Sequence, residues 1–173
     1  LLRRNYIWTP ALVAFRRDVL EELGGFDPRV SPSADYDLYL RIPRRYEFAP
    51  HEIVVAEYRQ HEGGMSRNPV LMLKASLAVL RRHRRHALRR RATPHAYRAG
   101  ARHWREWYGE HLVERFRTAI RAHGGRSDAI QCAWHLLRLY PHGIAKHVMK
   151  KVLLTTRRVK SSLYGRDVPA ESP

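Results

Sequence analysis

The 173-residue sequence predicts an α+β protein that is predominantly helical. A short α/β stretch at 1–67 is expected to precede an amphipathic helical region at 68–163 and a tail at 164–173. Two observations support this division. Strand-like alternation is confined to the first part, whereas apolar residues recur at helical spacing in the second. Residues 1–68 carry ten Lys/Arg and ten Asp/Glu, so the remainder, with 23 Lys/Arg and six Asp/Glu, holds the whole net charge of +17.

In the α/β stretch, the pattern predicts a buried strand at 6–15, a helix at 16–23, a second helix at about 34–42 and a strand at 53–58. Gly24-Gly25 is expected to end the first helix, because the residue past a helix end usually has a left-handed backbone, which glycine adopts readily. Ser33 is a favourable N-cap for the second helix, and Pro43 limits it.

The helical region is divided by its own start and stop signals into four expected helices. Asn68-Pro69 and Thr93-Pro94 each place proline after a capping residue, and Gly124-Gly125 stops the second helix. The inward stripes are predicted to be Leu73, Leu77, Leu80 and Leu88 in the first helix; Tyr97, Ala101, Trp104, Tyr108, Leu112, Phe116 and Ile120 in the second; Ile130, Ala133, Trp134 and Leu137 in the third; and Ile144, Val148 and Val152 in the fourth.

Composition excludes several classes of protein. The chain is 44% apolar, which excludes a disordered chain. No apolar run approaches the ~20 residues that a membrane-spanning helix needs. The single cysteine, Cys132, cannot form an internal disulfide, so it does not indicate a redox compartment.

Four motifs in the first part carry a resemblance to a known family. They are an apolar strand followed by Arg16-Arg17, the turn Gly24-Gly25-Phe26-Asp27, the helix start Asp35-Tyr36-Asp37-Leu38-Tyr39-Leu40-Arg41, and Tyr58-Arg59-Gln60-His61. In this order and spacing, residues 5–67 resemble the C-terminal half of a family 2 glycosyltransferase of the GT-A fold. The resemblance covers a little over a third of the chain, and the helical remainder is only loosely similar to accessory helices of some bacterial members.

The resemblance implies a partial GT-A unit without its donor-binding N-terminal half, since no Asp-x-Asp precedes residue 24. The chain is therefore expected to be inactive alone. The whole protein would be an inverting enzyme that transfers a sugar from a nucleotide-sugar donor to a glycan or lipid-linked acceptor. We would expect it in the cytoplasm, peripheral at the inner face of the cell membrane.

The resemblance also implies roles for individual residues. Asp35 would be the general base, which takes the proton of the acceptor hydroxyl. Gly24 and Gly25 would form a donor-proximal loop, and Arg59 would lie near the diphosphate. His61 would ligate a divalent metal, Mn²⁺ or Mg²⁺, that neutralises the departing diphosphate. Asp37 is expected at the rim of the site or as a helix cap.

Simpler interpretations of the same residues remain open. Asp35 is also an ordinary helix-start acid, Gly24-Gly25 an ordinary helix stop and His61 an ordinary surface residue. Arg59 would then face solvent or an acid. Family members often carry Glu-Asp where this chain has Ala34-Asp35, so a neighbouring carboxylate cannot be assumed.

The basic helices allow three interpretations: a solvated face, a surface for anionic membrane lipids, or a nucleic-acid surface. Arg81-Arg82-His83-Arg84-Arg85-His86 and Arg89-Arg90-Arg91 would suit a phosphate backbone. Nucleic acid is least favoured, because no helix-turn-helix, zinc or RNA-binding signature accompanies them. The alternative to an enzyme is a non-catalytic basic helical module that binds nucleic acid or a protein partner.

Overall fold

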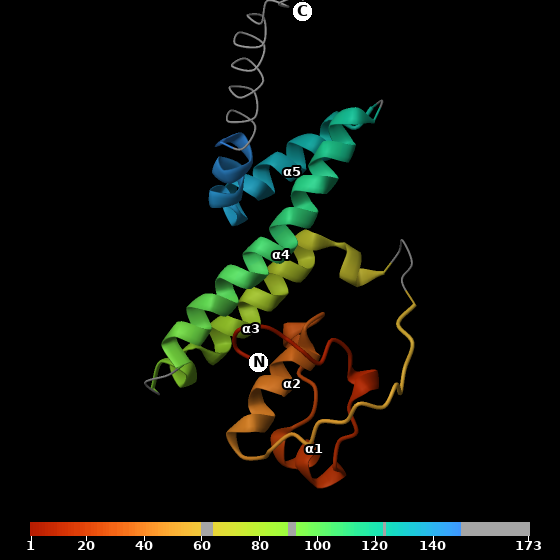
Figure 1. Ribbon diagram of the computed structural model, residues 1–173, viewed down its shortest axis with the longest axis vertical. Helices are drawn as coiled ribbons and strands as arrows, with labels where there is room; N and C mark the ends of the chain where they lie inside the picture. Colours follow the sequence, from red (N-terminus) through yellow and green to blue (C-terminus); the bar gives the residue numbers. More distant parts are fainter. Residues whose placement is uncertain (60–63, 90–92, 123, 150–173) are drawn as a thin grey trace, which may run out of the picture.

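The computed structural model describes residues 1–59, 64–89, 93–122 and 124–149, and shows helices joined by loops (Figure 1). The helices are α1 (Arg17–Leu23), α2 (Ala34–Arg41), α3 (Pro69–Arg89), α4 (Thr93–Arg121) and α5 (Arg126–Leu139). Residues 141–149 are also helical. Short 3₁₀ turns lie at Pro10–Leu12, Pro28–Val30, Ile42–Arg44 and Met65–Arg67.

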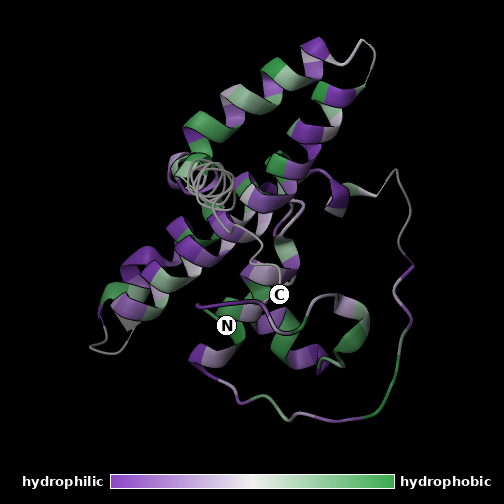
Figure 2. Ribbon diagram, turned by 45° about the horizontal axis from the view of Figure 1, so that its top comes forward, coloured by the Kyte–Doolittle hydropathy of each residue, from purple (hydrophilic) through white to green (hydrophobic). Residues whose placement is uncertain are grey.

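The predicted α/β stretch is wrong: the part of the chain that the structure describes contains no β-strand. The 6–15 segment contains only a 3₁₀ turn, and 51–59 has no regular structure. Strands are stable when they pair, and neither segment has a partner strand among the described residues. The alternation at 53–58 therefore leaves Ile53 and Val54 exposed, in a wide loop that carries hydrophobic residues (Figure 2). The chain has a helical fold and not an α/β GT-A fold.

The helix boundaries agree with the local signals. Asn68 caps α3, because its side-chain oxygen accepts a hydrogen bond from the backbone N–H of Leu71 at 3.1 Å. Leu73 and Leu80 of the predicted α3 stripe are buried, as is Leu77, but Leu88 is exposed and Ala87 is buried instead. The stripe continues at Ala87 because it lies two helical turns, or seven residues, after Leu80.

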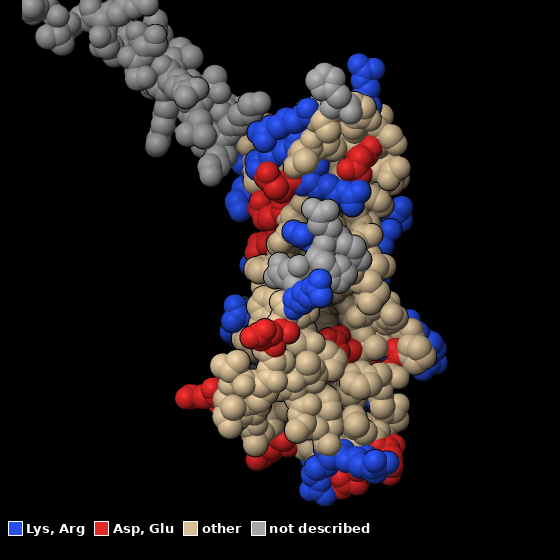
Figure 3. All heavy atoms as spheres, turned by 90° about the vertical axis from the view of Figure 1, so that its right-hand side faces the viewer, with Lys and Arg blue, Asp and Glu red and all other residues tan. Residues whose placement is uncertain are grey.

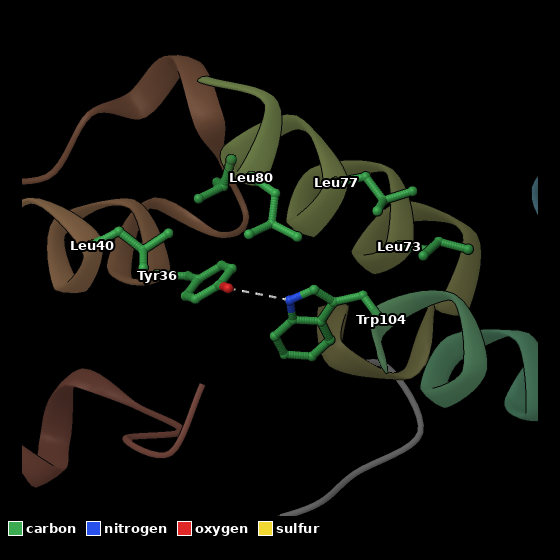
Figure 4. Packing of buried hydrophobic residues seen from close by; sticks show 7 residues of the cluster. Tyr36, Leu40, Leu73, Leu77, Leu80 and Trp104 are labelled. Carbon is green, nitrogen blue, oxygen red and sulfur yellow. Dashed lines mark hydrogen bonds between the residues drawn. The ribbon is translucent and has the colours of Figure 1, made fainter. Parts of the chain in front are cut away.

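A first core joins the N-terminal part to the helical region. α3 and α4 form an antiparallel hairpin, and α2 packs against it (Figure 1). In Figure 4, the Tyr36 ring of α2 meets Trp104 of α4 edge to face at 5.5 Å, and the Trp104 indole N–H donates to the Tyr36 hydroxyl at 3.4 Å. The cluster consists of Tyr36, Leu40, Leu73, Leu77, Val79, Leu80 and Trp104. The position of α2 is therefore set by α3 and α4.

A second core lies between α4 and α5, which folds back along the C-terminal half of α4 (Figure 1). It consists of Leu112, Val113, Cys132, Leu136 and Tyr140. The predicted inward face of α5 was wrong, because Ile130, Trp134 and Leu137 are exposed. Apolar residues cover more than half of the circumference of α5, so its pattern could not indicate which part of that arc would meet α4. Ile120, at the end of the α4 stripe, is likewise exposed.

Candidate functional site

Asp35 lies in the wall of a pocket of about 160 Å³ between α2, α3, α4 and the N-terminal segment. Its position follows from the start of α2 at Ala34, which puts Asp35 in the first helical turn. The other walls are largely aromatic. The lining residues are Arg4, Asn5, Trp8, Pro32, Ser33, Asp35, Tyr36, Met72, Ser76, His103, Trp104, Trp107 and Tyr108. A carboxylate is thus set among flat apolar rings.

The aromatic wall is built mainly by α4. Trp104 and Tyr108 are four residues apart, so they lie on one helix face, and their rings stack with centroids 5.6 Å apart. Trp107 meets Trp8 edge to face at 6.3 Å. Trp8 has a φ of +66°, a left-handed backbone that is rare for a bulky residue and occurs at functional sites. Its indole is nevertheless exposed, which leaves an apolar ring at the pocket mouth.

The electrostatic environment of Asp35 is that of a half-buried acid. Burial raises the pKa of its carboxyl group above the ordinary value, although the backbone N–H of Tyr36 donates to Oδ1 at 2.7 Å. Backbone hydrogen bonds lower the pKa of Asp35, but burial outweighs them. Burial, with a contribution from the charge of Asp35, raises the pKa of Tyr108 to about 12. An ionised carboxylate with a raised pKa is a stronger base, which is the property that proton abstraction needs.

A second pocket, of about 680 Å³, adjoins the first, because Trp8, Met72, Trp107 and Tyr108 line both. Three arginines line the second pocket: Arg59, Arg67 and Arg115. Arg115 also pairs with Asp128 at 2.7 Å. Guanidinium groups present several N–H donors in a planar arrangement that suits phosphate oxygens. The structure thus places Arg59 in the lining of one pocket with two further cations and Glu57, next to the pocket that holds Asp35.

Gly24 and Gly25 end α1 and line neither pocket. Their φ values are +73° and +60°, and the N–H of Gly25 donates to the Leu20 carbonyl at 2.8 Å. The Arg41 guanidinium donates to the carbonyls of Leu23 and Gly25, the latter at 2.6 Å. The structure therefore places the glycine pair as a helix stop that is anchored to α2, away from the Asp35 pocket.

Asp37 lies in the core rather than at the pocket rim, since its side chain is completely buried. Its carboxylate accepts hydrogen bonds from Arg41 Nε and His83 Nε2, both at 2.8 Å, and Arg82 Nε lies 3.5 Å away. Burial disfavours the ionised form, but His83, Arg41 and Arg82 outweigh it and lower the pKa of Asp37. Asp37 is a structural link between α2 and α3.

Asp27, the acid of the glycine turn, belongs to the same network of ion pairs as Asp37, because Arg82 lies close to both carboxylates. Asp27 accepts from Arg82 of α3 at 2.6 Å and from the side chain and backbone of Arg29. The bonds to Arg29 and Arg82 hold the pKa of Asp27 well below its usual range. Arg44 donates to His83 Nδ1, which leaves Nε2–H as the donor to Asp37. The glycine turn that ends at Asp27 and the helix start that contains Asp37 are therefore both bonded to α3, through Arg82 and His83.

His61, the predicted metal ligand, lies outside the described residues. Within the described ranges, no group of three or more His, Cys, Asp or Glu side chains converges as a metal site would require. The divalent metal accordingly stays a prediction that is tied to His61.

The basic run on α3 is divided by burial. His83 is buried and Arg82 is ion-paired, whereas Arg81, Arg84 and Arg85 are exposed.

Over the described ranges, no helix combines the length and the apolar content that a bilayer crossing demands.

Comparison with known proteins gives no relative: no family model matches this chain, and neither a curated protein nor a solved structure is detectably similar to it.

The pocket residues that the sequence analysis did not predict are Trp8, Trp107, Arg67 and Arg115. A signal for part of this set was present, because Trp107, His111 and Arg115 recur every four residues and share one face of α4.

Proposed function

We propose that this chain supplies the acceptor-binding and proton-accepting part of an inverting glycosyltransferase. The enzyme would move a sugar from a nucleotide-sugar donor to a glycan or lipid-linked acceptor. The observation that carries the proposal is the half-buried carboxylate of Asp35 in an aromatic pocket. The C–H face of a sugar ring packs against an aromatic face, which is negatively polarised, and a carboxylate beside it reaches the sugar hydroxyls.

In the proposed reaction, an acceptor hydroxyl oxygen attacks the anomeric carbon of the donor. The bond from that carbon to the diphosphate oxygen breaks as the new bond forms, and the hydroxyl proton passes to Asp35. The charge that develops on the leaving diphosphate would be stabilised by Arg59, Arg67 and Arg115. The positions of the two pockets support this assignment. Trp107 and Tyr108 line both pockets, so an acceptor beside Asp35 would lie next to a diphosphate beside the arginines.

Asp35→Asn tests the proposal in the protein expressed from its complete reading frame. Release of nucleoside diphosphate would be measured from a panel of UDP-, GDP- and dTDP-sugars with glycan and lipid-linked acceptors. We expect transfer to fall about 100-fold or more, because Asn cannot take the proton. Asp18→Asn, which removes an exposed acid that lines neither pocket, is the matched control and should retain activity. Transfer at the wild-type rate by Asp35→Asn would refute the assignment.

The exposed Arg81, Arg84 and Arg85 favour one other function, a basic helical module for nucleic acid. The two functions are distinguished by the same variant, since Asp35→Asn should leave polyanion binding unchanged. Tight, salt-sensitive DNA binding that is weakened by Arg84→Gln/Arg85→Gln, together with undetectable transfer, would favour the module.

A further inference from the structure

α5 carries an apolar stripe that no described residue covers. Ile130, Trp134 and Leu137 are four and three residues apart and therefore share one helix face. Their exposed fractions are 70%, 60% and 62%. Cys132 and Leu136, on the inward face, are buried against α4. Because the opposite face of α5 packs on α4, the stripe faces away from this core.

Cations border this stripe. Arg126 precedes Ile130 by one helical turn, and Arg138 follows Trp134 by one turn. Between residues 120 and 149 the bases are Arg121, Arg126, Arg138 and Lys146, all exposed, and the one acid, Asp128, pairs with Arg115. Lys146 lies 3.6 Å from Glu110 of α4, so Arg126 and Arg138 are the bases that the stripe offers to a partner. Figure 3 shows Lys and Arg side chains around the α4–α5 end of the molecule, with uncharged surface and a few Asp or Glu side chains between them.

We propose that the outward face of α5, defined by Ile130, Trp134 and Leu137, docks on an anionic membrane surface. An interfacial helix places apolar side chains at the boundary of headgroups and acyl chains and its bases among the lipid phosphates. Tryptophan suits this depth, because its ring is apolar and its N–H is polar. Arg126 and Arg138 are exposed and lie one turn before Ile130 and one turn after Trp134 on the same side of α5, so their guanidinium groups would reach lipid phosphates.

Other occupants of this face fit the observations less well. A second copy of the chain would bring Arg126 and Arg138 against like charges, on molecules that each carry a net charge of +17. Nucleic acid would pair with the arginines but would leave Trp134, Ile130 and Leu137 without an apolar partner. Anionic lipid satisfies the charges and the apolar stripe together. This inference does not depend on the proposed sugar transfer.

The test is co-sedimentation of the 173-residue chain with vesicles of phosphatidylcholine plus phosphatidylserine, and with phosphatidylcholine vesicles alone. The stripe variant is Ile130→Ser/Trp134→Ser/Leu137→Ser. Its matched control is Ile53→Ser/Val54→Ser, which removes apolar side chains that are 73% and 89% exposed elsewhere. We expect about tenfold or more weaker binding to the mixed vesicles for the stripe variant, and no change for the control.

A charge variant, Arg126→Gln/Arg138→Gln, leaves the apolar stripe intact. It should also bind the mixed vesicles about tenfold or more weakly, while the weaker binding to phosphatidylcholine vesicles stays unchanged. Circular dichroism of each variant would establish that the helices are retained, which the exposure of all five side chains leads us to expect.

Three results would overturn the inference. The first is vesicle binding by the stripe variant that equals that of the wild type. The second is a wild-type dimer in analytical ultracentrifugation that the stripe variant dissociates, because the face would then join two copies. The third is binding of duplex DNA, without vesicle binding, that the stripe variant loses.

Discussion

α2 and α5 differ in which side chains they bury. α2 buries five of its eight residues, and one of them, Asp37, is an acid. α5 buries two of its fourteen residues, and leaves a tryptophan, a leucine and an isoleucine in solvent. Burial in this chain therefore depends on how many other elements a helix packs against. α2 is held by the α3–α4 hairpin, whereas α5 meets α4 on one face only.

Within α2, two acids that are two residues apart have different environments. Asp37 accepts hydrogen bonds from Arg41 and His83, and its pKa is lowered. Asp35 faces an aromatic pocket, and burial raises its pKa. A paired acid stabilises the fold, whereas an unpaired acid in a pocket is available for chemistry. Substitutions in both helices can test whether the two acids and the two helices differ in this way.

The largest effect on stability is expected from Asp37→Ala. Removal of this carboxylate leaves Arg41 and His83 without their buried acceptor, and breaking a buried pair costs about 3–5 kcal/mol. Urea denaturation of the chain would measure the free energy of unfolding. Asp128→Ala is the control, because its pair with Arg115 is exposed and such pairs contribute at most about 1 kcal/mol. Equal losses in the two variants would contradict a structural role for Asp37.

Two neighbouring leucines of α5 test which face of the helix is buried. Leu136 is buried, so Leu136→Ala should leave a cavity and cost about 2–5 kcal/mol. Leu137 is 62% exposed, so Leu137→Ala should change stability by about 0.5 kcal/mol or less. Denaturation midpoints at equal m-values would provide the comparison. A larger loss for Leu137→Ala would mean that α5 is turned the other way.

Acid should weaken the fold through Asp37. Because its pKa is lower when folded, Asp37 contributes stability that is present above the pKa of the unfolded chain. That contribution is lost as the pH falls through the lower, folded pKa. Asp37→Asn should therefore show a shallower loss of stability with acid than the wild type, in thermal melts across the acidic range. Parallel curves would exclude the ionised form of Asp37 as a stabilising group.

The smallest effect is expected at Asp35, and its sign is opposite. Its folded pKa is raised, so its contribution to stability is present below the unfolded pKa and is lost as the pH rises through the folded value. At neutral pH, Asp35→Asn should melt at the same temperature as the wild type or slightly above it. A clear fall in the melting temperature would indicate a structural role for the carboxylate.

The sequence predicted the helices better than their contacts. Caps, prolines and glycines act locally, so Asn68 and Gly24 mark helix ends whatever surrounds them. Strands depend on a partner, so the alternation at 53–58 was misleading. The orientation of α5 was not predictable, because apolar residues lie around most of its circumference.

The candidate site was predicted in part. Asp35 and Arg59 were chosen from motifs, and each lies in the wall of a pocket. Trp8 and Trp107 could not be added from the sequence, because they are about a hundred residues apart and meet only through the packing of the N-terminal segment on α4. The role of Asp37 was missed for the same reason, since His83 belongs to another helix.

A side-chain ¹³C NMR titration of the aspartate carboxyl groups would show directly whether Asp35 is a desolvated base and Asp37 a paired structural acid. Assignment would use the chain and its Asp35→Asn variant. We expect Asp35 to titrate above the ordinary pKa of aspartate and Asp37 to titrate below it. If Asp35 titrated at or below its ordinary value, it would be a solvated helix-start acid, and the proposed base would be contradicted.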